Sequence, residues 1–390
     1  MKYITSILLL IAIHHTTLAQ VGINDALKEI EANSPTIVAL KAQMDYQKAE
    51  ARTEFLPPNP TVEGGRFPAV EGAGIKYAWG VTQSFEFPTV YAKRNQLAKT
   101  IDGFAEARYN AARQQVLLDA KHTLLETIHT KRLLAEYRRR KAFARNMLLV
   151  IQKKVDGGQA TAMDLNNARL RVAEARHNVR EFEAKANIMA QRISVLNGGV
   201  PLTLNDTVLL AVAPADRNTL LGSFTQSDPR YAAIEQMIVV AEGNKSLVAH
   251  QGLPELNIGY QSEQSDSEHF RGFKAGLSIP LWGNTGKRRA AAVQVNAARV
   301  EGESQHRMLE LEFNELYLET TSTKSQLDEL RQALVGFSNL ALLQRALEAG
   351  QVSVIDFFNE VTFLYGITDR VMELELEYAK LYAELHRFEL

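Results

Sequence analysis

The side chains that could hold a metal ion are few and scattered in this sequence. His122 and His129 lie seven residues apart, so a helix would carry both on one face. The chain contains no cysteine, which excludes disulfides, thiolate metal ligands and cysteine catalysis. The sequence also has no His-Glu-x-x-His motif and no methionine-rich run. We therefore expect neither a metal site nor a cofactor.

Motifs for catalysis are missing as well. The sequence has no glycine-rich phosphate loop, no Gly-x-Ser-x-Gly elbow and no acid pair with an obvious pocket. We predict that the chain is not an enzyme. Its net charge of −1 at pH 7 argues against nucleic acid as a partner. The basic residues Lys131-Arg132 and Arg138–Lys141 have acids among them and are interpreted as a solvated helix face.

Two segments combine a glycine, a hydroxyl residue and an acid at one spacing. The pattern Gly-Gln-x-[Thr/Ser]-x-x-Asp begins at Gly158 and again at Gly350, 192 residues later. Glycine readily takes the left-handed conformation that ends a helix. The hydroxyl residue and the acid form a box that caps the next helix. We predict two tight connections between helices and call them the tip turns (residues 156–161 and 348–353).

The acids of the tip turns allow a second interpretation. Several chains could bring Asp156, Asp164, Glu348 and Asp356 into a negative ring, which would favour cations and raise carboxylate pKa values by mutual repulsion. Capping alone explains both motifs, so the ring is an additional hypothesis. The residues assigned to the tips and to such a gate are Asp156, Gly157, Gly158, Thr161, Asp164, Glu348, Gly350, Ser353 and Asp356.

Long helices must position these turns. The segment from Tyr91 to Val155 has no proline and only one glycine, which predicts one helix of about 100 Å at 1.5 Å per residue. The return segments Ala162–Leu196 and Val354–Leu390 carry apolar residues at alternating spacings of three and four, the pattern of a coiled-coil seam. The seam positions are Leu165, Ala168, Val172, Ala175, Val179, Phe182, Ala186, Met189, Ile193 and Leu196, then Leu364, Ile367, Val371, Leu374, Tyr378, Leu381, Leu385 and Phe388. We also interpret residues 21–55 as a helix.

Two pairs of segments alternate with period two and predict β-hairpins at about 60–87 and 254–279. One face is apolar and the other is small or polar, with Gln83 as an exception. A membrane barrel and an ordinary soluble hairpin both fit this alternation. The predicted membrane-facing residues are Tyr77, Trp79, Val81, Phe85, Leu256, Ile258, Tyr260 and Leu277, and the predicted strand–helix junctions are Pro57, Pro88, Pro254 and Pro280.

The whole layout occurs twice. Ser34-Pro35 is matched by Asp228-Pro229, and Phe87-Pro88 by Ile279-Pro280, at offsets of 194 and 192 residues. We divide the chain into a signal peptide (1–19), repeat 1 (20–196), a linker (197–227) and repeat 2 (228–390). Each repeat contains a helix, a β-hairpin, a long helix, a tip turn and a return helix.

Four strands are too few to close a barrel, since known barrels begin at about eight. An open sheet is not viable in a bilayer because its edge groups would be unpaired. If the strands lie in a membrane, several chains must share one barrel, and three chains of four strands would give twelve. The predicted fold is mainly α with a small β part: an α-helical coiled-coil tunnel joined to a shared transmembrane β-barrel.

The combined layout resembles the TolC-type outer membrane factors of tripartite efflux pumps, over essentially the whole mature chain. The resemblance rests on the signal peptide, the duplication, the proline junctions and the two tip motifs. It implies a homotrimer in outer membrane lipid, a periplasmic tunnel, and an equatorial belt at 197–227. It also implies two partners: a periplasmic adaptor, which meets the tips, and an inner-membrane pump of the RND type. Without a cysteine, no lipid anchor is expected.

The resemblance implies a passive exit duct for small molecules or metal cations, and the pattern is similar to the heavy-metal cation efflux branch. Two alternatives stay open. A duct for type I protein secretion would have the same fold. A periplasmic coiled-coil adaptor would also carry a helical hairpin, but a single one flanked by soluble β domains, without duplicated strand pairs.

Overall fold

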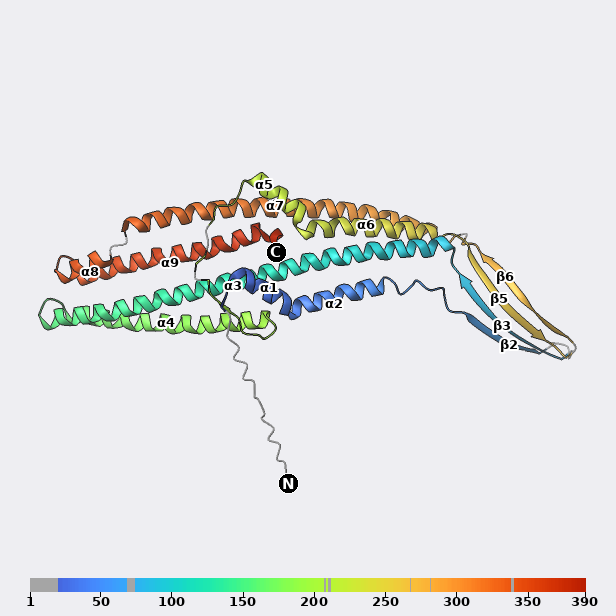
Figure 1. The fold of residues 1–390 in the computed structure, drawn as a ribbon, viewed down its shortest axis with the longest axis horizontal. Helices are drawn as coiled ribbons and strands as arrows, with labels where there is room; N and C mark the ends of the chain where they lie inside the picture. Colours follow the sequence, from blue (N-terminus) through green and yellow to red (C-terminus); the bar gives the residue numbers. More distant parts are fainter. Residues whose placement is uncertain are drawn as a thin grey trace, which may run out of the picture. The chain divides into compact units, whose positions relative to one another are not determined.

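The computed structural model describes residues 20–68, 74–206, 208–209, 212–266, 268–280, 282–337 and 340–390. The predicted signal peptide (1–19) and most of the predicted loop between the first two strands lie outside these ranges. The chain forms two compact units, each built from three segments (Figure 1). Unit 1 comprises Met1–Pro35, Leu117–Ala213 and Thr321–Ala383, and unit 2 comprises Thr36–Val116, Pro214–Thr320 and Glu384–Leu390.

Unit 1 is a bundle of long helices. The predicted long helix is confirmed as α3 (Pro88–Asp156), whose residues from Leu117 onward belong to this unit. The return helix α4 (Ala162–Leu196) has the predicted bounds, and α9 (Val354–Leu385) begins where predicted. The second long helix is described as α7 (Thr285–Phe337) and α8 (Leu340–Glu348), with residues 338–339 outside the described ranges.

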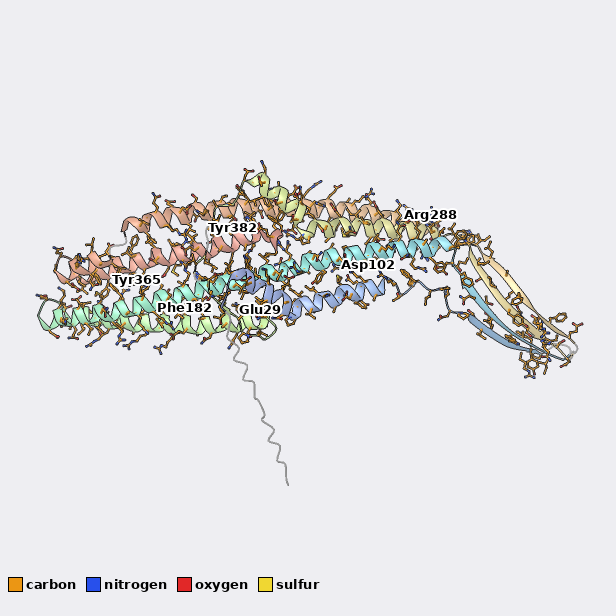
Figure 2. The ribbon with its side chains drawn as sticks, viewed as in Figure 1. Glu29, Asp102, Phe182, Arg288, Tyr365 and Tyr382 are labelled. Carbon is orange, nitrogen blue, oxygen red and sulfur yellow. The ribbon has the colours of Figure 1, made fainter. Side chains whose placement is uncertain are left out.

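Every position of the two predicted seams is buried or half-buried. The α4 seam packs on α3, where the ring of Phe182 stacks on Tyr137 with centroids 4.7 Å apart (Figure 2). The α9 seam packs on α7, where Val371, Leu374 and Tyr378 form an apolar cluster with Leu327. Burying each large side chain stabilises the bundle by about 1.5–3 kcal/mol.

The expectation of one helix over residues 21–55 is wrong. The structure has α1 (Ile23–Asn33) and α2 (Pro35–Glu50), separated at Ser34 with φ −64° and ψ 119°. Pro35 explains the break, because its ring disfavours the helical conformation of the preceding residue. The Ser34 N–H still donates to the Ile30 carbonyl, at 2.8 Å, and so closes the last turn of α1.

The linker contains more structure than its composition suggested. Strand β4 (Thr203–Leu204) pairs in parallel with β1 (Gln20–Val21), and α5 (Arg217–Ser227) is capped by the Asp216 carboxylate. The buried Tyr378 hydroxyl donates to the Val212 carbonyl. Strands β1 and β4 have only two residues each, which is too short for a detectable periodicity, so sequence patterns did not reveal them.

Unit 2 contains α2, the first part of α3, α5, α6 (Pro229–His250), most of α7 and a β-sheet. Both predicted hairpins are confirmed: β2 (Thr61–Pro68) pairs with β3 (Ile75–Phe85), and β5 (Glu255–Gln264) pairs with β6 (His269–Ser278). Strands β3 and β5 join them into one antiparallel sheet in the order β2-β3-β5-β6. Among the described residues, no helix combines the length and the apolar character needed to cross a membrane.

The register of the sheet puts the predicted outward residues on one face. Val81 lies opposite Tyr260, and Phe85 lies opposite Leu256, which in turn lies opposite Leu277. Directly opposed residues of antiparallel strands share a face. Gln83 is the exception to the apolar series on this face. Its side-chain amide is satisfied locally, because it donates to the Pro58 carbonyl at 2.6 Å.

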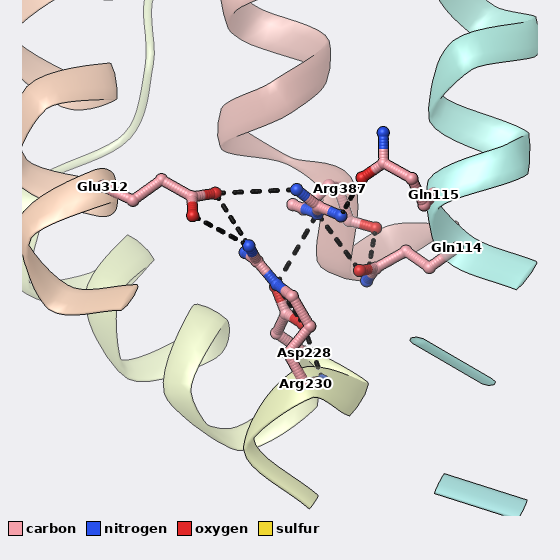
Figure 3. Close-up of polar contacts among 6 residues, drawn as sticks. All are labelled: Gln114, Gln115, Asp228, Arg230, Glu312 and Arg387. Atoms are coloured by element: carbon pink, nitrogen blue, oxygen red, sulfur yellow. Dashed lines mark hydrogen bonds and ion pairs between the residues drawn. The ribbon is translucent and has the colours of Figure 1, made fainter. Parts of the chain in front are cut away.

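A partly buried polar cluster in unit 2 contacts the C-terminal end of the chain, and we call it the C-terminal cluster (Figure 3). The Arg387 guanidinium donates to Gln114 Oε1 at 3.1 Å and lies 3.5 Å from Glu312 Oε1. Arg230 makes two bonds of 2.9 Å to the Glu312 carboxylate and also pairs with Asp228. Two arginines thus balance two acids. The members are Gln114, Gln115, Asp228, Arg230, Glu312 and Arg387.

Candidate functional site

The first tip turn has the geometry that its glycine predicts. Gly158 has φ +72°, in the left-handed region that glycine enters without strain. The Gly158 N–H donates to the Val155 carbonyl at 3.0 Å, and the Gln159 N–H donates to the Lys154 carbonyl at 2.7 Å. These two bonds form a Schellman motif, which satisfies carbonyls that the end of α3 would leave unpaired.

The second tip turn repeats the first in detail. Gly350 has φ +73°. Its N–H donates to the Leu347 carbonyl at 3.1 Å, and the Gln351 N–H donates to the Ala346 carbonyl at 2.8 Å. The two turns therefore match in their individual hydrogen bonds at the ends of α3 and α8.

The helices that follow the turns are capped as predicted. The Asp164 N–H donates to Thr161 Oγ1 at 3.2 Å, and the Thr161 N–H donates to the Asp164 carboxylate at 2.9 Å, which completes a capping box. In the second turn the Ser353 hydroxyl donates to the Asp356 carboxylate at 2.6 Å and accepts from the Asp356 N–H at 3.1 Å. Both acids therefore have a structural role within their own helices.

The two tips share an apolar core in unit 1. Phe357 is fully buried at its centre, and its ring stacks on Phe143 of α3 with centroids 6.3 Å apart. The Lys154 ammonium donates to the Glu348 carbonyl at 3.3 Å and so links one turn to the other. The buried members of this core are Met147, Ile151, Leu165, Ala168, Leu347, Val354, Phe357, Phe358 and Val361.

A buried arginine joins α3 to α9 in the same unit. The Arg140 guanidinium binds both oxygens of the Asp369 carboxylate, at 2.7 and 2.9 Å, and donates to Glu136 at 3.0 Å. It also lies 4.3 Å from the centre of the Tyr365 ring. Arg140, Tyr365 and Asp369 line a cavity of about 270 Å³, and burial raises the pKa of Tyr365 to about 12.

The interpretation of the basic run as a solvated face is therefore wrong for two of its members. Arg140 is only 7% exposed, and Arg132 pairs with the buried Glu375 at 2.6 Å, whereas Arg138 and Arg139 are exposed. Heptad spacing could have found Arg140, because it lies seven residues from each of the buried residues Leu133 and Met147.

The acids assigned to a gate do not meet within one chain. Asp156 accepts from its neighbour Gln152 at 2.8 Å, and Glu348 accepts from Gln344 at 3.0 Å. Asp164 and Asp356 are engaged in caps, as described above. A negative ring would therefore need several chains, and it stays a hypothesis.

The candidate metal ligands do not gather into a site. His129 is buried, and that burial lowers its pKa, helped by the nearby charge of Arg132. Across the part of the chain that the structure describes, no group of three or more His, Cys, Asp or Glu residues is placed to hold a metal ion.

The four junction prolines lie between strands and helices, as predicted. Pro57 follows α2 and precedes β2, and Pro254 immediately precedes β5. Pro88 is the first residue of α3, where its missing N–H leaves no helix bond unmade. Pro280 lies between β6 and α7.

Replacing both Asp164 and Asp356 with asparagine separates capping from charge. Asparagine keeps an acceptor oxygen, so each helix should lose only about 0.3–1 kcal/mol of interaction with its dipole. If the acids form a ring, the double variant should show a weaker cation preference, measured as the reversal potential of single channels in a salt gradient. Asp45→Asn, on the exposed surface of α2, is the matched control. A reversal potential equal to that of the wild type would refute the ring.

Comparison with solved structures finds the same fold in outer membrane channels. The outer-membrane channel OprN superposes with a TM-score of 0.76 at 14% identity, covering 94% of this chain and 89% of OprN. The CmeC outer membrane channel of Campylobacter jejuni gives 0.73 at 12% identity, covering 94% and 85%. CusC, whose structures concern transmembrane channel formation, gives 0.70 at 14% identity, covering 94% and 92%.

These three proteins are channels rather than enzymes. No protein-family model matches the sequence, and no curated protein matches it. The likeness therefore lies in the fold, which is that of the TolC-type outer membrane channels.

Proposed function

We propose that this chain is one subunit of a homotrimeric exit duct in the outer membrane. The duct would carry cargo passively from the periplasm to the exterior as part of a tripartite efflux system. Its partners would be a periplasmic adaptor and an inner-membrane pump of the RND type. The shared fold supports this proposal, and one feature of the sheet carries it.

That feature is a four-stranded sheet with an apolar outer face and two unpaired edges. Strands β2 and β6 each have a neighbour on one side only, and every residue of β6 is exposed. Phe273 is 87% exposed and Leu277 is 61% exposed. A long exposed edge strand with apolar side chains would promote aggregation in water. Closure into a shared barrel satisfies the edges and turns the apolar face toward lipid.

Exposed seams on the helices also support assembly with further copies. Helix α7 exposes Val293, Val300, Leu311 and Leu318, and these residues follow the spacing of a coiled coil. Helix α4 exposes a similar series on the side away from its buried seam: Met163, Leu170, Ile188 and Val195. Neighbouring subunits would bury both series.

In this mechanism the chain catalyses no reaction, because the pump would supply the driving force for transport. An adaptor would dock at the tip turns, and the helix ends would then separate to open the duct. The geometry limits where such a movement can occur. Arg140 of α3 binds Asp369 of α9 through two charge-assisted hydrogen bonds. The helix segments that move would therefore be those between this ion pair and the turns at Gly158 and Gly350.

The cargo would be small molecules or metal cations, and membership of the heavy-metal cation branch stays a prediction. A type I secretion duct is the main alternative, because it would use the same fold. A soluble adaptor is less compatible with a four-stranded sheet that joins both repeats. Export assays in which the chain is paired with an RND pump or with a protein-secretion pump distinguish the two ducts.

Membrane fractionation tests the proposal directly. We expect the mature full chain in the outer membrane fraction, and the detergent-extracted protein should have three times the mass of one chain. Resistance to carbonate extraction separates membrane insertion from loose attachment. A soluble periplasmic monomer or dimer would contradict the duct and favour the adaptor alternative.

A further inference from the structure

The outer face of the sheet changes character along its length. In the rows nearest the helices it carries aliphatic and aromatic side chains, such as Phe85, Leu256 and Leu277. Toward the hairpin loops an aromatic cluster follows, in which the Tyr260 ring lies 5.6 Å from Trp79 and 5.5 Å from Phe273. Aromatic residues at this position are typical of the membrane–water interface.

Basic residues lie on the same face from the row of Trp79 toward the hairpin loops. Arg66 lies opposite Tyr77 in the last rows of the sheet, His269 lies opposite Gln264, and Arg271 lies opposite Ser262. All three basic side chains are exposed. Within the described part of the chain, neither arginine forms an ion pair with an acid.

The acids near this end of the sheet do not neutralise the two arginines. Glu63 and Glu263 alternate onto the opposite face, where Glu263 pairs with Lys76 at 2.5 Å. Asp266 and Glu268 belong to the connecting loop, beyond the ends of the strands. Among the described residues, the outer face therefore has a net positive charge next to its aromatic cluster.

Closure of the barrel would bring the two arginines together. Arg66 lies on the edge strand β2, two residues before its end at the loop, and Arg271 lies on the other edge strand β6, two residues after its start at the loop. Both hairpin loops are at the same end of the antiparallel sheet. In a ring of subunits β6 would pair with the partner subunit's β2, so Arg271 and the partner subunit's Arg66 would meet at one subunit boundary near the loop end of the sheet.

We propose that each subunit boundary binds a phosphate group of the glycolipid in the outer leaflet, between Arg271 and the partner subunit's Arg66. This inference rests on the proposed trimer. Two guanidinium groups can each bind a phosphate through two hydrogen bonds, and the aromatic cluster would contact the acyl chains below. Lipid A has phosphorylated sugars at this depth, and a trimer has three boundaries, so three such sites are expected.

The test uses the detergent-extracted full-chain protein with diphosphoryl lipid A as the probe. Native mass spectrometry should show retention of up to three lipids per trimer. A basic residue near a membrane surface contributes about 1 kcal/mol, or about fivefold in affinity. Arg66→Gln combined with Arg271→Gln should therefore weaken binding about 30-fold, and lysine at both positions should weaken binding less, because lysine keeps the charge but loses the paired hydrogen bonds.

Lys274→Gln is the matched control. It removes one positive charge from the same strand as Arg271, but Lys274 lies opposite Gly259 on the other face of the sheet, so lipid A binding should not change. Equal binding by the double variant and this control would overturn the proposal. Binding of phosphatidylglycerol as tight as that of lipid A would overturn the assignment to the glycolipid.

The two proposals can fail separately. An outer membrane trimer with unaltered lipid binding in the double variant would refute only the lipid site. A wild-type chain that is soluble and monomeric would refute the duct and the lipid site together.

Discussion

Replacing Gly158 or Gly350 with valine is expected to abolish export while leaving the trimer intact. Both residues have a positive φ, of +72° and +73°, and a Cβ at either position would meet no atom within 4 Å. The effect would therefore come from backbone strain and not from a clash. An L-residue in this conformation costs roughly 1–2 kcal/mol, and a β-branched residue is disfavoured further.

Strain of this size is too small to separate the seams of the bundle, where each large buried side chain contributes about 1.5–3 kcal/mol. It is sufficient to change the turn, because the Schellman bonds require the left-handed residue. Since an adaptor would dock on these turns, we expect export to fall to the level of a strain without the duct. Native mass of the extracted protein would show whether the trimer persists.

Two substitutions serve as controls for the valine variants. Gly158→Asn should retain export, because asparagine tolerates the left-handed conformation. Gly157→Ala should do so too, since Gly157 does not have a positive φ and its Cβ would lie 3.4 Å from the nearest atom, the Lys153 carbonyl oxygen. Loss of the trimer in the valine variants would mean that the glycines serve assembly, and full export would mean that the turn geometry is dispensable.

Arg387→Met is expected to lower the stability of unit 2 by up to about 3–5 kcal/mol, because Arg230 alone would then face the two acids Asp228 and Glu312 and one negative charge would lose its compensation. The side chains of Arg387 and Asp228 are 8% and 0% exposed. For a unit of this size, a loss of 3 kcal/mol corresponds to a fall of about 6–12 °C in the midpoint of thermal unfolding. Circular dichroism of the extracted protein measures this midpoint.

Arg299→Met is the matched control, because Arg299 pairs with Glu242 on the surface, with side chains 59% and 48% exposed. Such pairs contribute about 0–1 kcal/mol, so the midpoint should hardly change. Asp228→Asn preserves the cap of α6, since asparagine caps as well as aspartate. Combined with Arg387→Met, it should destabilise less than the sum of the single changes. Equal effects of Arg387→Met and Arg299→Met would show that the C-terminal cluster does not stabilise the protein.

The sequence by itself determined most of the long elements. The long helix predicted over Tyr91–Val155 follows from the absence of helix breakers, and the return helix Ala162–Leu196 and both hairpins follow from periodicity within one segment. The tip turns were also predictable, because a left-handed glycine and an N-cap box depend on neighbours only a few residues away. The duplication made each of these predictions twice.

Only the tertiary structure decided which faces of the helices and strands are buried, and which distant segments of the chain bury them. Arg140 binds Asp369, 229 residues away, and Gln114 meets Arg387 across 273 residues, so no local pattern specified that these polar residues are buried. The pairing of β3 with β5, which merges two hairpins into one sheet, is likewise a long-range choice. Periodicity shows that a helix or strand has an apolar face. The burial of individual polar residues and their charge pairing depend on which distant segment packs against that element.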